Sequence, residues 1–244
     1  MLKDLGIKII ILSRGRSQSI TTTKVLPEFI EVLVPESQKS LYEAVVRNPI
    51  ITTPDDVLGL GKLRNWCIDN FKEETVIMMD DDISRCYSLT GLKSKRLDKE
   101  QTLEVLVNTA IMAKDAGCKC FGFTQTDIRK YNATNPFSLC TWVGGVIGVI
   151  GKGRKFRNDK FKVDIDFCLE NLLTNRILWC DNRFLFSQKR DSNVGGNSEF
   201  RTKDSYKDST NSLKEKWGKY VIISEHNSQL RIKLNVQRKQ QIQL

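Results

Sequence analysis

The sequence predicts an α/β fold, a single domain built around a mostly parallel central sheet. Short apolar, β-branched runs such as residues 7–12 (IKIIIL) and 75–79 (TVIMM) have the length and character of buried strands. Helical spacing of apolar residues separates such runs, most clearly over residues 97–117, where Gly117 ends the pattern. Strands that alternate with helices favour parallel pairing, because a parallel crossover needs a connection of helix length.

In the first half of the chain, apolar runs bounded by turn residues predict strands at residues 7–12, 29–35, 48–54 and 75–79. Helices are predicted at residues 36–46 and 62–71. Glu36 and Ser37 suit the first turn of the earlier helix. The predicted order of elements up to residue 79 is therefore strand, strand, helix, strand, helix, strand.

In the second half, helices are predicted at residues 97–117 and 163–176, and strands at residues 118–123, 138–150, 177–180 and 183–186. A polar stretch without an apolar anchor follows from residue 187 to residue 210, and it is expected to form a partly mobile loop. Residues 214–224 and 230–236 predict a closing helix and two short strands. The sequence contains no internal repeat and no domain linker, so we expect one domain over residues 1–244.

The composition is that of a globular protein with a real core. Of the 244 residues, 40% are hydrophobic and 28% are charged. The longest apolar stretch, residues 142–151, has four glycines in ten residues and is too short to span a membrane. The N-terminal apolar run is too short for a signal-peptide core. The seven cysteines are odd in number and include no CxxC, which predicts free thiols in a cytoplasmic protein.

The net charge of +10 is unevenly distributed along the chain. Residues 152–162 (KGRKFRNDKFK) carry six basic residues and one acidic residue, and residues 92–99 and the tail after Arg231 are also basic. Clusters of this kind suit a polyanion, through phosphate contacts and counterion release. The alternative is a well-solvated cationic surface without a partner.

Three adjacent carboxylates, Asp80, Asp81 and Asp82, follow the strand predicted at residues 75–79. In open α/β sheets, ligands bind beyond the carboxyl ends of the strands. Carboxylates two residues apart at such an end can hold Mg²⁺ or Mn²⁺, which would also relieve their mutual repulsion. The alternative to a metal site is that the three aspartates cap a helix or lie in a solvated turn. The polar turn at residues 13–19 and the glycines around Gly144 are further candidate sites at strand ends.

The glycine-rich stretches do not match the standard phosphate-binding motifs. Residues 59–64 (GLGKLR) begin like GxGxxG but have Arg64 in place of the third glycine. Neither this stretch nor residues 148–153 (GVIGKG) completes a P-loop, because the first glycine and the final Ser or Thr are absent. The sequence therefore argues against P-loop, kinase and dinucleotide-binding functions.

The order of the remaining motifs resembles a GT-A glycosyltransferase. A strand running into a polar turn, the helix GLGKLRNWCIDN and the strand VIMMDDDIS follow one another as in the nucleotide-binding half of the inverting enzymes. Arg64 and Asn65 stand where that group has its G…ARN helix, although Leu63 replaces the usual alanine. GGVIGVIGKG and VDIDF resemble the acceptor half, with its acidic catalytic motif. The resemblance covers most of residues 7–180.

Within this group, the compact length, the opening SRGRSQSITTTKVLP and the basic balance look most like the TET-associated and base-J-associated glycosyltransferases. These phage and protist enzymes put sugar on hydroxymethylated pyrimidines in DNA. The resemblance implies a Rossmann-like GT-A domain whose nucleotide-sugar-binding half is residues 1–90 and whose acceptor half is residues 91–244. It also implies a cytoplasmic location, in the host cytoplasm if a phage encodes the chain.

The resemblance assigns roles to individual residues. It implies that the UDP-sugar donor is bound by Arg14, Arg16, Gly61, Arg64, Asn65, Asp80, Asp81, Gly144 and Gly145. Asp82 would bind Mn²⁺ or Mg²⁺, with His226, the only histidine, as a candidate further ligand. Val163 stands where the acidic pair usually begins, so the catalytic base would be Asp164 or Asp166.

The resemblance and the charge together predict a metal-dependent inverting transferase. It would move a sugar, with glucose expected, from a UDP-sugar to 5-hydroxymethylcytosine in DNA, and the protein is expected to be monomeric. The basic segment 152–162 and the loop 187–205 would hold DNA phosphates through Lys152, Arg154, Lys155, Arg157, Lys160, Lys189 and Arg190. A GT-A enzyme for polysaccharide, lipid or protein, a nucleotidyltransferase and a non-catalytic DNA-binding protein are the alternatives.

Overall fold

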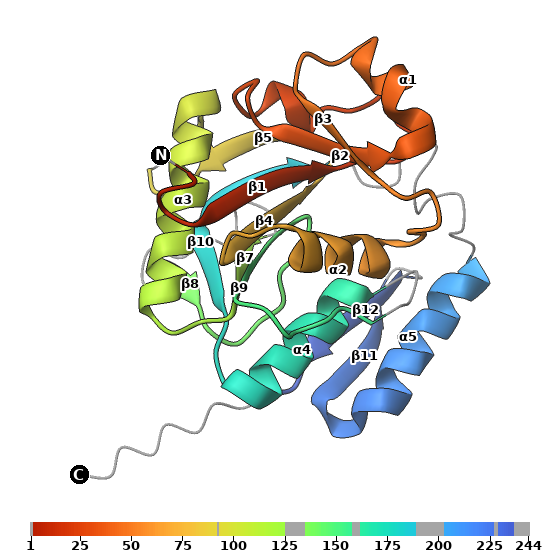
Figure 1. Cartoon of the computed structure of the whole chain (residues 1–244). Coiled ribbons are helices and arrows are strands. Elements are labelled where there is room, and N and C mark those ends of the chain that lie inside the picture. The colour runs from red at the N-terminus through yellow and green to blue at the C-terminus, as the bar shows by residue number, and fades with distance from the viewer. Residues whose placement is uncertain are drawn as a thin grey trace.

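The computed structural model of the chain describes residues 2–91, 93–124, 135–157, 162–188, 203–226 and 229–236, without the side chains of residues 203–206, His226 and Gln229. Within this part the chain forms one large mixed sheet covered by helices on both faces (Figure 1). A separate two-stranded sheet follows near the end of the chain.

Among the described residues, ten strands form the large sheet, in the order β3–β2–β1–β4–β9–β7–β10–β5–β6, with β8 paired to β10. Their bounds are β1 (Ile7–Leu12), β2 (Glu31–Pro35), β3 (Ile50–Thr53), β4 (Thr75–Asp80), β5 (Ile83–Ser88), β6 (Lys95–Arg96), β7 (Cys120–Thr124), β8 (Phe137–Ser138), β9 (Val146–Ile150) and β10 (Trp179–Gln188). Strands β3, β2, β1, β4, β7, β10 and β6 run in one direction, and β5, β8 and β9 run against them. The predicted α/β fold with a mostly parallel sheet is confirmed.

The helices are α1 (Lys39–Glu43), α2 (Leu60–Asn70), α3 (Lys99–Asp115), α4 (Val163–Asn175) and α5 (Lys203–Trp217), with 3-10 turns η1 (Thr22–Lys24), η2 (Glu36–Gln38) and η5 (Gly218–Tyr220). The alternation of side chains along β1 divides the core between the two faces of the sheet. Ile9 and Ile11 pack with α3 on one face, and Ile10 and Leu12 pack with α2 and α4 on the other (Figure 1).

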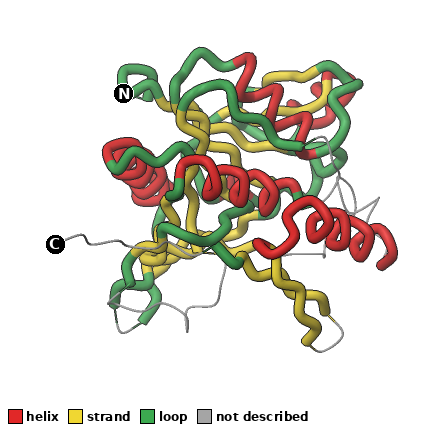
Figure 2. Tube along the Cα trace, turned by 90° about the horizontal axis from the view of Figure 1, so that it is seen from below, coloured by secondary structure: helices red, strands yellow, loops and turns green. Residues whose placement is uncertain are grey.

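The C-terminal part of the chain packs against α4 rather than against the large sheet. Helix α5 precedes an antiparallel hairpin of β11 (Val221–His226) and β12 (Gln229–Leu234), and Figures 1 and 2 show both beside α4. Ile165 and Leu169 of α4 form a small buried cluster with Leu213 and Val221. This C-terminal unit therefore holds the helix that carries the two candidate catalytic aspartates.

Most predicted elements are present, but four differ from the sequence prediction. The helix predicted at residues 36–46 is shortened to η2 and α1, because the chain must turn to enter β3. The strand predicted at residues 138–150 is split, and only β8 and β9 remain at its ends. The two strands predicted between residues 177 and 186 form the single strand β10. Helix α5 begins inside the predicted polar loop.

All seven cysteines are free, as predicted, and Cys140 alone among them is not fully buried. Burial raises the pKa of the Cys67 and Cys86 thiols to about 12, so both remain protonated and inert at neutral pH. No helix in the described part of the chain is long and apolar enough to cross a membrane.

Candidate active site

The three aspartates at the end of β4 have two sets of partners, because Asp80 and Asp82 share Gln188 whereas Asp81 pairs with Arg16. Asp80 is the last residue of β4 and shares the α2–α4 face of the sheet with Val76 and Met78. Its backbone N–H donates to the carbonyl of Gly145 at 2.8 Å, which joins the strand end to the glycine-rich stretch before β9. Two of the segments singled out as candidate sites at strand ends therefore lie in contact.

Asp81 anchors the turn after β1. Its carboxylate accepts hydrogen bonds from Ser13 Oγ at 2.5 Å and from Arg16 Nη1 at 2.8 Å, and its side chain is almost fully buried. The Tyr42 hydroxyl lies 2.6 Å from Ser13 Oγ and accepts from the backbone N–H of Arg16 at 3.0 Å. Asp81 and Tyr42 thus fix the position of Arg16 at the strand ends.

Thr22 holds the backbone of the aspartate turn from the other face of the sheet. Its hydroxyl donates to the carbonyl of Asp80 at 2.6 Å and accepts from the N–H of Ile83 at 3.0 Å. The N–H of Thr21 donates to the carbonyl of Asp81 at 2.9 Å. These bonds satisfy the polar groups of a tight, buried turn and make it rigid.

Arg64 of α2 lies beneath Asp80 with only 1% of its surface exposed. Its Nη2 atom is 3.4 Å from Asp80 Oδ1, and its guanidinium lies over the Phe156 ring, 5.2 Å from the centroid. Within the described part of the chain, its Nε and Nη1 atoms have no hydrogen-bond partner. Each buried, unsatisfied donor costs about 1–3 kcal/mol. The arrangement therefore favours an anionic ligand.

Gln188, the last residue of β10, joins two of the aspartates. Its Nε2 atom lies 3.2 Å from Asp80 Oδ2 and 3.2 Å from Asp82 Oδ1. Gly145 has a φ of +71°, and a Cβ added there would come within 2.5 Å of the Gln188 side chain. Glycine at position 145 is therefore required both by the backbone conformation and by the close approach of Gln188.

The electrostatics of this cluster favour a cation. Burial raises the pKa of Asp80, as do the charges of Asp81 and Asp164, and the Arg64 guanidinium opposes the shift. Burial also raises the pKa of Asp82 to about 7, with repulsion from Asp80 and Asp81 adding to the effect. Ionising both carboxylates at neutral pH is therefore costly until positive charge arrives beside them.

The two candidate bases on α4 have different environments. Asp166 is 1% exposed, accepts from Lys216 Nζ at 2.9 Å and from Trp217 Nε1 at 2.7 Å, and lies 3.9 Å from Arg157 Nη1. Asp164 is partly exposed, no described residue hydrogen-bonds its carboxylate, and its charge acts on Asp80. Asp166 thus has the contacts of a structural anchor, whereas Asp164 is available to a substrate at the cluster.

Two other residues with predicted donor-binding roles contact the segment before α4. The amide of Asn65 makes two hydrogen bonds with the backbone of Phe156, with Nδ2 donating at 2.8 Å and Oδ1 accepting at 2.7 Å. A Cβ added to Gly61 would lie 2.0 Å from the carbonyl oxygen of Arg157. Both residues hold this segment against α2, and their contact with a donor stays a prediction.

The predicted DNA-binding residues of the segment 152–157 make intramolecular contacts. Lys152 donates to the last carbonyls of α2, Arg154 bonds the Asn175 side chain at 2.9 Å, and Lys155 pairs with Asp69. Lys160, Lys189 and Arg190 lie outside the described residues. Their DNA contacts stay predictions.

The remaining candidates lie around the same strand ends or outside the described side chains. Gly144 is buried directly before Gly145, and Arg14, which follows β1, acts electrostatically on Asp55 beyond β3. His226 ends β11, and its side chain is not described. Its role as a metal ligand stays a prediction.

The described residues fit a divalent cation only in partnership with a phosphorylated ligand. Among them, no group of three or more His, Cys, Asp or Glu side chains is arranged to hold a metal. Mg²⁺ commonly binds through one or two carboxylates together with substrate phosphates. The carboxylates of Asp82 and Asp80, which both lie within hydrogen-bonding distance of the Gln188 amide, offer such a partial set of oxygen ligands.

Sequence reasoning missed Gln188, Tyr42 and Thr22. The sequence predicts a polar loop from residue 187, whereas in the structure Gln188 is the last residue of β10. Tyr42 and Thr22 contact the site through tertiary packing, and no local pattern marks them. Ser13 stood in the polar turn singled out after β1, but its bond to Asp81 could not be read from the sequence.

The fold is similar to that of solved glycosyltransferases. Glucosyl-3-phosphoglycerate synthase from Mycobacterium tuberculosis, in complex with Mn²⁺, UDP and glucosyl-3-phosphoglycerate, matches with a TM-score of 0.51 and 9% identity, over 95% of this chain and 90% of that chain. TarS 1–349 from S. aureus, in complex with UDP-GlcNAc, matches with a TM-score of 0.49 and 14% identity, over 85% of this chain and 65% of that chain. The chain spans less than two thirds of the length of the TarS chains that it matches.

The fold is therefore that of the GT-A glycosyltransferases. No curated protein matches the chain at the level of sequence. Residues 7–197 match the family described as TET-Associated Glycosyltransferase, and this range includes β4, α2, α4 and every described side chain of the aspartate cluster. The chain belongs to the TET-associated glycosyltransferase family.

Proposed function

We propose that this glycosyltransferase moves a sugar, with glucose expected, from a UDP-sugar to the hydroxymethyl group of 5-hydroxymethylcytosine in DNA, with inversion at the anomeric carbon. The observation that carries the donor half of the proposal is the buried guanidinium of Arg64, which leaves two donors unsatisfied beside Asp80. Diphosphate oxygens would satisfy those donors, since arginine recognises phosphate through its fork of N–H groups.

The nucleoside of the donor would lie at the ends of β1 and β4. Arg16 is held there by Asp81 and Tyr42, and Asp80 faces the same edge of the sheet. Uridine as the nucleoside is supported by the family resemblance and by the fold shared with a synthase whose structure contains UDP and Mn²⁺.

Asp82 would bind Mn²⁺ or Mg²⁺ together with the diphosphate. The cation, when bound, supplies positive charge to the departing UDP. The raised pKa values of Asp80 and Asp82 support a site for a cation, because an added positive charge would stabilise both carboxylates. Arg64 would contribute further positive charge from below, at a fixed position that needs no rearrangement during the reaction.

Asp164 would act as the general base. In the reaction, the acceptor oxygen forms a bond to the anomeric carbon, the bond from that carbon to the diphosphate oxygen breaks, and the hydroxyl proton moves to the Asp164 carboxylate. General-base catalysis is worth typically about 10²–10⁴-fold in rate. Asp164 is preferred over Asp166 because Lys216 and Trp217 already occupy the Asp166 carboxylate.

DNA as the acceptor is supported by the family and by the net charge of +10. Because the reacting group sits on a base, either a wide site or a flipped nucleotide is needed. Membership in a glycosyltransferase family speaks against the nucleotidyltransferase and non-catalytic alternatives. An enzyme for a polysaccharide, lipid or protein acceptor would share every donor contact described above.

The test is an incubation with a panel of nucleoside-diphosphate sugars and duplex DNA, with and without 5-hydroxymethylcytosine. Digestion to nucleosides and mass analysis then identify the product. We expect one glycosylated nucleoside, formed only from hydroxymethylated DNA, a UDP-sugar and a divalent cation. Equal donor consumption with unmodified DNA, or without any DNA, would argue against this acceptor.

A further inference from the structure

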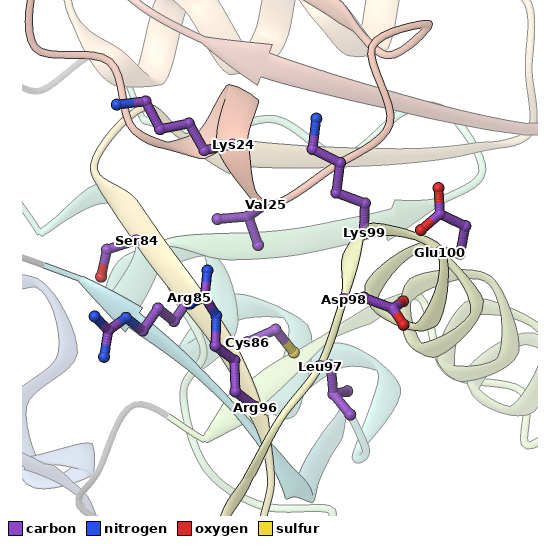
Figure 3. A pocket seen from close by; sticks show the side chains of 10 residues that line it. All are labelled: Lys24, Val25, Ser84, Arg85, Cys86, Arg96, Leu97, Asp98, Lys99 and Glu100. Carbon is purple, nitrogen blue, oxygen red and sulfur yellow. The ribbon is translucent and has the colours of Figure 1, made fainter.

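A second cationic site lies on the opposite face of the sheet from Arg64. A cavity of about 410 Å³ opens between η1, β5 and the start of α3. Sites that hold small ligands are about 300–1,000 Å³, so the cavity can admit a phosphate together with its attached sugar. Figure 3 shows four basic side chains around it, Lys24 and Lys99 on the upper side in this view and Arg85 and Arg96 on the lower side.

These four cations are not neutralised within the described part of the chain. No described carboxylate pairs with any of them, and Arg85 donates only to the Tyr87 hydroxyl, at 3.1 Å. Of the two acidic residues at the cavity, Asp98 accepts the N–H of Gln101 at 2.8 Å and caps α3. The carboxylate of Asp98 is therefore committed to the helix.

The segment predicted to bind DNA differs in this respect. Lys152 is bonded to the last carbonyls of α2, Lys155 is paired with Asp69, and Arg157 lies beside Asp166. A phosphate that bound these side chains would have to compete with existing partners. At the cavity on the other face, no such competitor is present among the described residues.

The basic character continues beyond the cavity along the edge of the sheet. Lys95 and Arg96 form the edge strand β6, both are exposed, and exposed Lys93 precedes them. Basic residues on an edge strand also discourage pairing with another chain, so their presence alone does not require a ligand. A row of cations that leads into a cavity nevertheless matches a ligand with repeating negative charge better than a single small anion.

The cavity is rigidly connected to the aspartate cluster. Strand β5 begins at the residue after Asp82. Arg85 lies three residues after Asp82, so the two Cα atoms are within about 10 Å of each other along an extended strand. Lys24 belongs to the turn whose Thr22 bonds the carbonyl of Asp80 at 2.6 Å. A ligand long enough to reach around the turn could contact the cavity and the reactive cluster together.

We propose that this cavity and the β6 edge bind the phosphodiester backbone of the acceptor DNA, away from the nucleotide that reacts. The proposal rests on DNA being the acceptor, as proposed above. It adds a phosphate-binding surface formed by Lys24, Arg85, Arg96 and Lys99, on the opposite sheet face from the donor site. Such contacts position the duplex and carry no information about its sequence.

The test compares the Arg85→Gln/Arg96→Gln variant with a matched control, Lys39→Gln/Lys114→Gln, which removes the same charge from exposed ion pairs with Glu43 and Glu74. Binding of each protein to a hydroxymethylated duplex is titrated at several salt concentrations. Two lost phosphate contacts should make the slope of log K against log salt shallower by about 1.8. Affinity at 0.1 M salt should fall roughly tenfold per contact. The control should match the wild type.

Further measurements separate the possible failures. Arg85→Lys/Arg96→Lys should keep most of the affinity, and UDP affinity should be equal in all variants. If the wild type binds DNA and the glutamine variant keeps its slope, the cavity does not bind DNA, and the proposed function stands. If the glutamine variant loses UDP affinity instead, the cavity serves a nucleotide and the proposal is wrong. If the wild type itself does not bind DNA, both proposals fail.

Discussion

The Nη2 atom of Arg64 lies 3.4 Å from Oδ1 of Asp80, so a fully buried guanidinium meets the last residue of β4. This single contact leaves Nε and Nη1 of Arg64 without a partner among the described residues. A buried charge with two unsatisfied donors is costly, and an anionic ligand would remove the cost. The pair therefore forms the floor of the proposed diphosphate site.

Arg64→Lys should weaken UDP binding at least about tenfold, because a lysine keeps the charge but cannot present the planar fork of donors. Isothermal titration with UDP and Mn²⁺ measures the effect. Lys62→Gln, on the exposed side of the same helix, removes a charge nearby and should leave UDP affinity unchanged. An Arg64→Lys variant that binds UDP like the wild type would remove the diphosphate role.

Asp164→Asn and Asp166→Asn should fail in different ways. Asp164→Asn should keep its melting temperature and its affinity for UDP and DNA, and lose at least about a hundredfold in turnover. Asp166→Asn should lower stability by about 1–3 kcal/mol, since it removes the charge of a buried carboxylate that accepts from Trp217 and from the half-exposed Lys216. Thermal unfolding and single-turnover assays on both variants separate the roles. The opposite pattern would move the base to Asp166.

Asp82→Asn should stabilise the protein at pH 8 but have little effect at pH 4. The pKa of Asp82 is raised in the folded state to about 7, so the folded protein binds the proton more tightly than the unfolded chain. The free energy of unfolding of the wild-type protein therefore decreases as pH rises from about 4 to 7. The Asp82→Asn variant shows no such decrease from this position, because its amide does not titrate. A gain of about 1 kcal/mol would raise the melting temperature by roughly 2–4 °C. Thermal scans without metal across this range test the sign.

Asp82→Ala should abolish metal-dependent turnover while leaving the fold intact. The mutation removes a carboxylate that repels Asp80 and Asp81, which offsets the loss of the Gln188 bond at 3.2 Å and of the attraction to Arg16. Turnover is measured with Mn²⁺ and after treatment with EDTA. A wild-type enzyme that stays fully active in EDTA would show that the metal role is wrong.

Much of the site could be predicted because parallel strands end at a common edge. The apolar run of β4 leads directly to Asp80, and the glycine-rich stretch meets it there through the carbonyl of Gly145. The helix that carries Arg64 directly precedes this strand in the chain and also lies beside it in the fold. The position of Asp80 follows from the end of an apolar run, whereas the approach of Gly145 depends on the antiparallel pairing of β9 with β4, which no local pattern indicates.

The rest depends on packing between distant segments. Gln188 reaches Asp80 across 108 positions of sequence, and nothing near residue 188 indicates that contact. The difference between Asp164 and Asp166 arises because Lys216 and Trp217, on α5, cover one carboxylate and not the other. Helix α5 begins at Lys203, inside the stretch predicted as a polar loop, because its first two turns lack the apolar spacing that indicates a helix and its buried Leu213 lies further along.

The acceptor and the stereochemistry of transfer are both determined by the structure of the product formed from UDP-glucose and a duplex with 5-hydroxymethylcytosine. After digestion, mass analysis shows whether a hexose has been added to the nucleoside, and the proton coupling of the anomeric carbon shows its configuration. We expect glucose on the hydroxymethyl oxygen with the β configuration, the inverse of the α-linked donor. An α-linked product would contradict direct displacement with Asp164 as base. DNA that stays free of sugar with every UDP-sugar, while a saccharide, lipid or protein acceptor is glycosylated, would contradict the proposed function.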